Sequence, residues 1–206
     1  ETHAVNQEAV LDTLEFIHHN ELPLKRFVFT SSAAVYGNLP DMPKKETTRV
    51  QPLTPYAIDK YASERFTIDY ERLYGIPTVA VRFFNVFGPK QNPDSPYSGV
   101  LSIITDKLKN DETFTLYGDG LQTRDFIYVA DVVKALRLVA TKTPKAAVYN
   151  VAQGGETSLL DLIHIYEKVS DKKLKINQKP ARKGDINKSV ADISKIKLIG
   201  FKPDWT

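Results

Sequence analysis

The chain has 206 residues, 42% of them hydrophobic and 26% charged, so it is long enough to bury a substantial core in one or two domains. Its 28 basic and 25 acidic residues leave a net charge of +3, too small and too dispersed to indicate a nucleic-acid partner. The absence of cysteine excludes disulfides and thiolate sites and favours a cytoplasmic location, and no apolar run approaches the ~18 residues of a membrane span.

Hydrophobic periodicity predicts helices that alternate with strands, as in α/β proteins. The expected helices cover residues 4–20, 55–74, 99–110, 129–141, 158–169 and 192–199. The expected strands cover residues 26–31, 77–84, 114–117, 125–128, 147–151 and 174–177. Prolines and charged residues indicate a surface loop over residues 39–55, and residues 89–99 read as an irregular crossing into a second lobe.

The first chemically informative residues follow the apolar strand 26–31, which reads as a buried parallel strand that ends near Ser32. Open α/β sheets bind their ligands at this carboxyl end. Tyr56 and Lys60 are four residues apart, so on a helix both side chains lie on one face. A phenol, with an ordinary pKa near ~10, is a poor base unless a nearby cation stabilises the phenolate. This pattern predicts proton transfer by Tyr56 and Lys60, with the Ser32 hydroxyl holding a substrate oxygen.

Each of these features also occurs by chance on amphipathic helices and at strand ends, but longer motifs surround them. In chain order these are Ser-Ala-Ala-Val-Tyr-Gly at 32–37, Thr-Pro-Tyr with Lys60 at 54–60, Val-Arg-Phe-Phe-Asn-Val-Phe-Gly-Pro at 81–89, and Gly-Asp-Gly followed by Arg-Asp-Phe-Ile-Tyr-Val at 118–129. Together they resemble the extended short-chain dehydrogenase/reductase superfamily and, within it, the nucleotide-sugar epimerases. The resemblance runs over essentially the whole chain.

The resemblance implies a Rossmann-like doubly wound parallel sheet that binds NAD, with a smaller α/β lobe that binds the substrate. Residues 1–88 and 124–152 would belong to the sheet domain, and residues 89–123 and 153–206 to the smaller lobe. None of the ten glycines forms the G-x-G-x-x-G phosphate turn of the family's first strand-to-helix connection. We therefore expect a sheet that lacks its amino-terminal half and its glycine-rich turn, a missing carboxyl-terminal helix, and a piece that is inactive by itself.

The resemblance also assigns residues to each ligand. Contacts with NAD are implied for Ser31, Tyr56, Lys60 and Phe83. Phe83 also fits ordinary core packing at the end of a buried strand. Contacts with the nucleotide sugar are implied for Asn85, Tyr117, Arg124, Arg182, Asp185 and Ser189.

Two of these residues suit a diphosphate on chemical grounds. The planar guanidinium groups of Arg124 and Arg182 can each give two charge-assisted hydrogen bonds to phosphate oxygens. An alternative reading makes Arg124 and Asp125 a surface ion pair. The four histidines have no spacing that indicates a metal site.

The residues after Ser32 indicate the type of reaction. Related dehydratases carry an Asp-Glu pair where this chain has Ala33 and Ala34, so the resemblance favours a 4-epimerase. In that reaction Tyr56 takes the proton from the sugar O4, Ser32 bridges the oxygen and Lys60 supports the phenolate, while NAD accepts and returns the C4 hydride.

The sugar is predicted from Ser189, which stands where epimerases restricted to glucose and galactose carry a tyrosine. The small residue favours UDP-N-acetylglucosamine and UDP-N-acetylgalactosamine, with UDP-glucose and UDP-galactose possible. The alternatives are UDP-glucuronate, whose carboxylate Lys183 or Lys188 could bind, another nucleotide-sugar oxidoreductase or dehydratase, and a protein that binds NAD without turnover. By resemblance we also expect a homodimer through helices 4–20 and 55–74.

Overall fold

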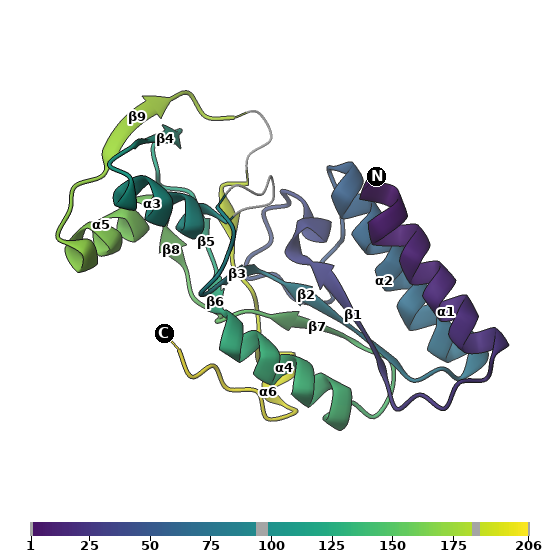
Figure 1. Ribbon diagram of the computed structural model, residues 1–206. Helices are drawn as coiled ribbons and strands as arrows, with labels where there is room; N and C mark the ends of the chain where they lie inside the picture. Colours follow the sequence, from purple (N-terminus) through teal and green to yellow (C-terminus); the bar gives the residue numbers. More distant parts are fainter. Residues whose placement is uncertain (1, 94–98, 183–185, 206) are drawn as a thin grey trace.

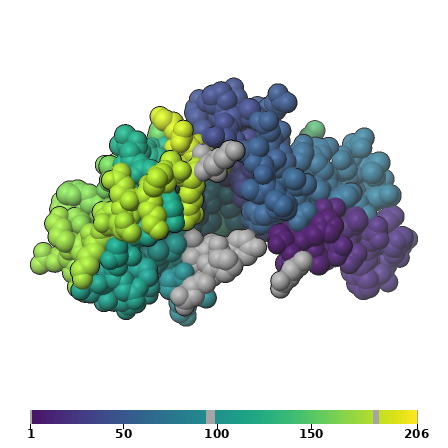
Figure 2. All heavy atoms as spheres, turned by 90° about the horizontal axis from the view of Figure 1, so that it is seen from above, coloured from purple at the N-terminus to yellow at the C-terminus, as the bar shows by residue number. Residues whose placement is uncertain are grey.

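The computed structural model of the chain describes residues 2–93, 99–182 and 186–205. It forms two lobes, which lie side by side in Figure 1. Figure 2 views the molecule from above and shows the N-terminal part, coloured purple to blue, separated by a hollow from the teal to yellow-green lobe. No helix in the described ranges is long and apolar enough to cross a bilayer.

The first lobe is built on a parallel sheet with the strand order β1-β2-β7, made of β1 (Phe27–Ser32), β2 (Thr78–Phe83) and β7 (Val148–Val151). The helix α2 (Pro55–Tyr74) covers one face of this sheet and α4 (Val129–Lys142) covers the other (Figure 1). Helices on both faces explain why β2 is buried almost along its whole length. The predicted Rossmann-like α/β fold is confirmed.

Local signals fix both ends of α2. The Thr54 hydroxyl accepts a hydrogen bond from the Ala57 amide at 3.2 Å, and Pro55 occupies the first helical position. Gly75 ends the helix in the left-handed region, with φ of 71°. These signals explain why the predicted and observed bounds, 55–74, agree.

The N-terminal segment differs from the single helix predicted over residues 4–20. It begins with a π-helix, η1 (Ala4–Glu8), and continues as α1 (Ala9–His19). The buried side chains of Leu14 and Ile17 pack against α2 and the residues that follow it. The predicted apolar face is therefore buried at Leu14 and Ile17, whereas Val5 and Ala9, which share its helical spacing, are exposed.

The second lobe contains two helices and a parallel pair of strands: α3 (Val100–Lys109), β4 (Thr113–Tyr117), α5 (Leu159–Ser170) and β9 (Lys175–Lys179). It has a core of its own, formed by Leu101, Ile104, Leu108, Phe114, Leu116, Leu162, Ile163 and Leu174. Strand β9 begins one residue later and ends two residues later than the predicted strand 174–177.

Short strands join the two lobes. One parallel pair consists of β3 (Asn85–Phe87) and β6 (Phe126–Tyr128), and a small sheet has the order β10-β5-β8, made of β10 (Lys188–Ser189), β5 (Thr123–Arg124) and β8 (Thr157–Ser158). Strand β6 starts after Asp125, one residue later than predicted. The sequence did not predict β3, β5, β8 or β10, because segments of two or three residues show no periodicity.

The C-terminal segment returns to the first lobe. The helix α6 (Ser194–Lys197) is shorter than the predicted helix 192–199. Ile196 of this helix and the flanking residues Ala191, Ile193 and Phe201 are buried in the same core as the central sheet. This placement differs from the expectation that all of residues 153–206 belong to the smaller lobe, because these apolar side chains complete the sheet's core.

Candidate active site

The strand register aligns the carboxyl ends of the central sheet. Ser32 at the end of β1 pairs with Phe83 at the end of β2, and Phe83 pairs with Val151. Ser32 also caps the 3-10 helix η2 (Ala33–Tyr36), whose Ala34 amide donates to the serine Oγ at 3.2 Å. The cap directs the hydroxyl of Ser32 to the point where the strand ends.

A cavity of about 180 Å³ lies at this edge of the sheet. It brings together five of the predicted site residues, each from a different strand, namely Ser32, Phe83, Asn85, Arg124 and Ser189. The walls near the serine are formed by Ala33 and Ala34. The cavity therefore combines hydroxyl, amide and guanidinium groups with small apolar side chains.

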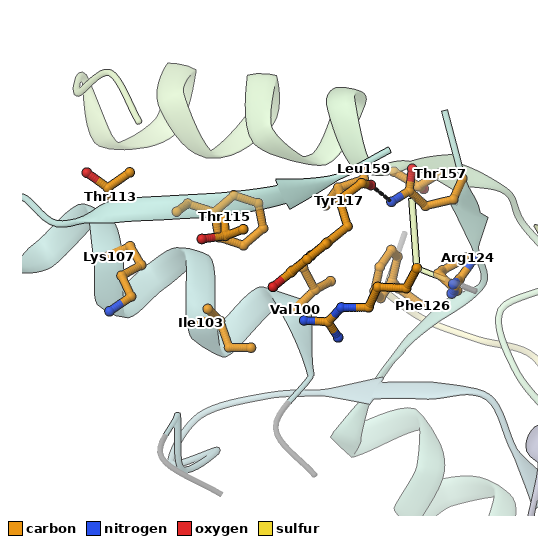
Figure 3. A pocket seen from close by; sticks show the side chains of 13 residues that line it. Val100, Ile103, Lys107, Thr113, Thr115, Tyr117, Arg124, Phe126, Thr157 and Leu159 are labelled. Carbon is orange, nitrogen blue, oxygen red and sulfur yellow. Dashed lines mark hydrogen bonds between the residues drawn. The ribbon is translucent and has the colours of Figure 1, made fainter. Parts of the chain in front are cut away.

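A larger cavity of about 440 Å³ lies in the second lobe (Figure 3). Apolar side chains from α3, β6 and α5 form much of its wall, including Val100, Ile103 and Leu159. Arg124 lines this cavity as well as the smaller one, so the two cavities adjoin at its side chain. A cavity whose wall combines apolar side chains with the guanidinium groups of Arg124 and Arg182 suits an aromatic base attached to an anion.

Tyr117 and Arg182, also predicted for the substrate, lie together in the larger cavity. The Arg182 guanidinium carbon is 3.7 Å from the centre of the Tyr117 ring, a cation–π contact. A hydrogen bond with Arg182 lowers the pKa of Tyr117. The Gln122 side chain donates to the Tyr117 carbonyl at 3.0 Å, which fixes the backbone from which the ring extends. The predicted Asp185 lies outside the described residues.

Tyr56 and Lys60 lie on the first turns of α2, which packs against β1 and β2. The Lys60 Nζ donates to the Thr30 carbonyl at 3.1 Å and lies 5.9 Å from the centre of the Tyr56 ring. Burial lowers the pKa of Lys60. The structure thus places the lysine beside the tyrosine ring and at the end of β1, although neither residue lines the two cavities described above.

The residues predicted to contact the cofactor fit such a group. Ser31 is 3% exposed, and its Oγ has no hydrogen-bond partner within the described ranges. A buried hydroxyl without a partner is unusual, and a bound polar group would satisfy it. Lys60 adds a partly desolvated ammonium, which is bound to the carbonyl of Thr30, the residue before Ser31. Phe83 adds a half-buried ring on the neighbouring strand. These donors and this ring suit the ribose and the flat ring of a nucleotide cofactor.

The surface ion pair considered for Arg124 and Asp125 is wrong, because Asp125 is fully buried. Its carboxylate accepts hydrogen bonds from the amides of Gln153 at 3.0 Å, Gly154 at 3.1 Å and Ala191 at 3.1 Å. Burial raises the pKa of Asp125 to about 6. Asp125 therefore connects β6 to residues 153–154 and to Ala191. A motif of neighbouring residues could not reveal contacts between segments so far apart in the sequence.

Lys44 is a residue of the smaller cavity that the sequence did not predict. It is 2% exposed, its Nζ donates to the Leu39 carbonyl at 2.5 Å, and burial lowers its pKa. The Lys44 amide donates a hydrogen bond to the Val190 carbonyl, and this contact holds the loop of residues 39–55 beside β10. No periodicity in residues 39–55 signals the insertion.

Comparisons with known proteins agree with this arrangement. The sequence pattern of the NAD dependent epimerase/dehydratase family matches residues 1–152 of the chain. The UDP-N-acetylglucosamine 4-epimerase of Methanobrevibacter ruminantium M1, solved with UDP-N-acetylmuramic acid, is 39% identical with a TM-score of 0.92, over 98% of this chain and 64% of that one. The UDP-glucose 4-epimerase of Thermotoga maritima, solved with UDP-glucose, is 32% identical with a TM-score of 0.92, over 99% and 66% of the two chains.

A third similar structure is the UDP-glucuronic acid 4-epimerase of Bacillus cereus, solved with UDP-glucuronic acid and NAD. It is 29% identical with a TM-score of 0.88, over 98% of this chain and 63% of that one. The chain thus spans 63% to 66% of the length of these three proteins. Since the family's pattern covers most of the chain, and solved epimerases share its fold over nearly every residue, the chain belongs to the NAD dependent epimerase/dehydratase family.

Proposed function

We propose that the protein is an NAD-dependent 4-epimerase of UDP-hexoses. The observation that carries this proposal is the position of Arg124, which lines both cavities. A diphosphate held by Arg124 would direct the sugar to the cavity of Ser32 and the base to the apolar cavity of Tyr117. Arg182, in contact with the Tyr117 ring, supplies a second guanidinium near the base.

Each residue at the sheet edge has a role in this proposal. Ser31, Tyr56, Lys60 and Phe83 would hold the nicotinamide end of NAD, whose chemistry is reversible hydride transfer at the sugar C4. Tyr56 accepts the proton of the sugar O4 and later returns it, while the Ser32 hydroxyl holds the same oxygen. Lys60, already beside the Tyr56 ring, stabilises the deprotonated phenol.

The walls of the smaller cavity support epimerisation over dehydration. Elimination of water needs an acid and a base near the sugar, and the positions after Ser32 carry the methyl groups of Ala33 and Ala34. Among the described residues that line the cavity, none is a carboxylate. Proton transfer at O4 needs only the Ser32, Tyr56 and Lys60 set.

For the sugar we favour UDP-N-acetylglucosamine and UDP-N-acetylgalactosamine, with UDP-glucose and UDP-galactose as further substrates. Ser189 lines the cavity with a small side chain, which leaves room for a 2-acetamido group. The second candidate is UDP-glucuronate, because Lys44 and Lys188 also line the cavity and are cations that suit a carboxylate. Against Lys44, its ammonium is already bonded to the Leu39 carbonyl.

The decisive experiment follows C4 inversion by NMR with the full-length protein, NAD and each UDP-sugar in turn. Inversion of one sugar that is lost in Tyr56→Phe supports the proposal and names the substrate. Tyr74→Phe is the matched control, because it removes the same hydroxyl from the far end of α2 and should retain activity. Absence of inversion for every sugar, with NAD bound, would favour a binding protein without turnover.

We also propose a homodimer formed through α1 and α2. Large apolar side chains remain exposed on these helices and on the turn before α1: Val5, Phe16, Ile58 and Leu73. A charge at Ile58, as in Ile58→Glu, should produce monomers in sedimentation equilibrium. The control Val169→Glu places the same charge on an exposed apolar position of α5 and should leave the dimer intact. A wild-type protein that stays monomeric at high concentration would contradict the proposal.

A further inference from the structure

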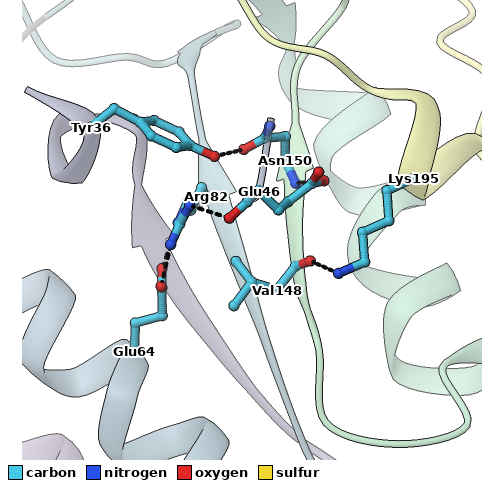
Figure 4. Close-up of polar contacts among 7 residues, drawn as sticks. All are labelled: Tyr36, Glu46, Glu64, Arg82, Val148, Asn150 and Lys195. Carbon is cyan, nitrogen blue, oxygen red and sulfur yellow. Dashed lines mark hydrogen bonds and ion pairs between the residues drawn. The ribbon is translucent and has the colours of Figure 1, made fainter. Parts of the chain in front are cut away.

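A buried ion pair connects the helix that carries Tyr56 and Lys60 to the central sheet (Figure 4). Glu64 on α2 and Arg82 on β2 are 1% and 3% exposed. The Arg82 Nη2 donates to Glu64 Oε1 at 2.6 Å, and its Nε donates to Glu64 Oε2 at 2.9 Å. Two parallel hydrogen bonds of this kind fix both the distance and the orientation of the two groups.

We propose that Glu64 and Arg82 are positioning residues that hold the Tyr56 and Lys60 helix in register with the turn that carries Ser32. This inference rests on the proposed function, because it concerns the geometry of the same three groups. Neither residue of the pair touches the proposed substrate cavities. Their effect on the reaction is therefore indirect.

Arg82 also contacts the serine side of the site. Its guanidinium carbon lies 4.7 Å from the centre of the Tyr36 ring, and Tyr36 ends the 3-10 turn that begins after Ser32. The Tyr36 hydroxyl donates to Asn150 Oδ1 at 2.7 Å, which ties that turn to β7 (Figure 4). Arg82 Nη1 also reaches the Glu46 carbonyl at 3.4 Å. One guanidinium thus contacts the helix, the turn and the loop that surround the site.

Glu64 lies one helical turn beyond Lys60, which lies one turn beyond Tyr56. Lys60 holds α2 to β1 through the Thr30 carbonyl, and Glu64 holds it to β2 through Arg82. With ties to two neighbouring strands, α2 can neither slide along its axis nor rotate without breaking one of them. Loss of the Glu64 tie would release Tyr56 and Lys60 together relative to Ser32.

Because the pair is ionic, its role in positioning α2 can be tested separately from its contribution to stability. Burial opposes the charge of Arg82, but the hydrogen bonds to Glu64, the negative charge of Glu64 and the contact with Tyr36 together raise the pKa of Arg82 above its usual value. Replacing a buried ion pair with apolar side chains of similar volume often leaves a protein equally stable. Such a replacement removes the fixed geometry while keeping the packing, so it separates the two roles.

The test uses the full-length protein and compares Glu64→Gln with Glu71→Gln. Glu71 is a matched control on the same helix, because its carboxylate accepts from the Thr78 and Ala146 amides at 2.9 and 2.6 Å at the end far from Tyr56. For Glu64→Gln we expect kcat to fall by about 10- to 100-fold, with KM and the Kd of UDP changed by less than about twofold. Glu71→Gln should lose stability yet keep kcat within about twofold.

Two further variants keep the proposal testable if Glu64→Gln folds poorly. Arg82→Lys retains the charge but loses the two-pronged geometry, and should lower kcat without changing the Kd of UDP. The double variant Glu64→Leu/Arg82→Met should restore the urea midpoint but not kcat. Recovery of kcat in the double variant, or equal losses of kcat in Glu64→Gln and Glu71→Gln, would overturn the proposal.

A measurement without turnover separates this proposal from the proposed function. Amide hydrogen exchange in residues 33–36 and 57–62 should be faster in Glu64→Gln than in the wild type, and unchanged there in Glu71→Gln. Unchanged exchange in both segments of Glu64→Gln would overturn positioning. A wild-type protein that inverts no sugar would instead overturn the epimerase assignment, and the exchange result would still decide the role of the pair.

Discussion

The Lys60 ammonium donates a hydrogen bond to the Thr30 carbonyl at 3.1 Å, so the first turns of α2 are attached to the carboxyl end of β1. The same ammonium lies 5.1 Å from the centre of the Phe29 ring. These contacts hold the cation in a partly desolvated place beside Tyr56, where its charge acts more strongly than it would in water.

Replacing this ammonium should impair turnover more than folding. Lys60→Met keeps the length of the side chain but removes the charge proposed to stabilise the Tyr56 phenolate. We expect kcat to fall by about 10²- to 10⁴-fold, measured by NMR of C4 inversion. The control Lys195→Met removes another half-buried lysine, which donates to the Val148 carbonyl at 2.8 Å, and should retain kcat. Equal losses in the two variants would point to a general packing defect.

Arg182→Ala should weaken binding of the nucleotide without unfolding the protein. The Arg182 side chain is exposed and rests on the Tyr117 ring, so its removal leaves no buried group unpaired. We expect the Kd of UDP, measured by calorimetry, to rise by about 10- to 100-fold. Lys179→Ala removes a nearby exposed cation from the end of β9 and should change the Kd far less. Similar increases of the Kd in both variants would show that Arg182 acts only through its positive charge and not through a specific contact with the nucleotide.

Substitution of Ser189 should change the choice of sugar. Ser189→Tyr fills part of the smaller cavity, and we expect it to lower kcat/KM for UDP-N-acetylglucosamine by at least about 10-fold relative to UDP-glucose. Ser189→Ala tests the hydroxyl without changing the volume much, and should keep the original ratio. An unchanged ratio in Ser189→Tyr would show that the 2-acetamido group lies elsewhere.

The buried carboxylate of Asp125 predicts a pH dependence of stability. Burial raises its pKa from 3.8 in the unfolded chain to about 6 in the folded one, so the folded state binds the proton more tightly. Its contribution to stability is therefore complete below about pH 4 and is lost as the pH rises through about 6. We expect the free energy of unfolding of the wild type, measured with urea and compared with that of Asp125→Asn, to fall by at most about 3 kcal/mol between pH 4.5 and pH 7. A pH-independent difference would contradict this assignment.

The sequence predicted those parts of the fold that carry local signals. Thr54, Pro55 and Gly75 mark both ends of α2, and the apolar runs of β1 and β2 mark the buried strands. Strands of two or three residues, such as β5 and β10, form only because their partners are supplied by distant segments. No single-segment pattern could have located them.

In the candidate site, too, the residues that stand in local motifs were predicted and those placed by remote contacts were not. The motifs singled out candidate side chains, and the structure brings three of them, Ser32, Asn85 and Arg124, to one cavity. Contacts between remote segments could not be predicted from motifs. The buried Asp125 carboxylate accepts hydrogen bonds from amides that lie 28 to 66 residues further along the chain, and the loop of Lys44 pairs with the residues after β10.

The return of residues 191–201 to the central sheet has a consequence for biosynthesis. Ile193, Ile196 and Phe201 complete the core around Val81 and Val151, although they are synthesised about 40 residues after β7. During synthesis, the apolar surface of the sheet can therefore be covered only after the intervening residues of the second lobe have been made. Truncations that end before residue 191 would leave this apolar surface uncovered and should therefore aggregate.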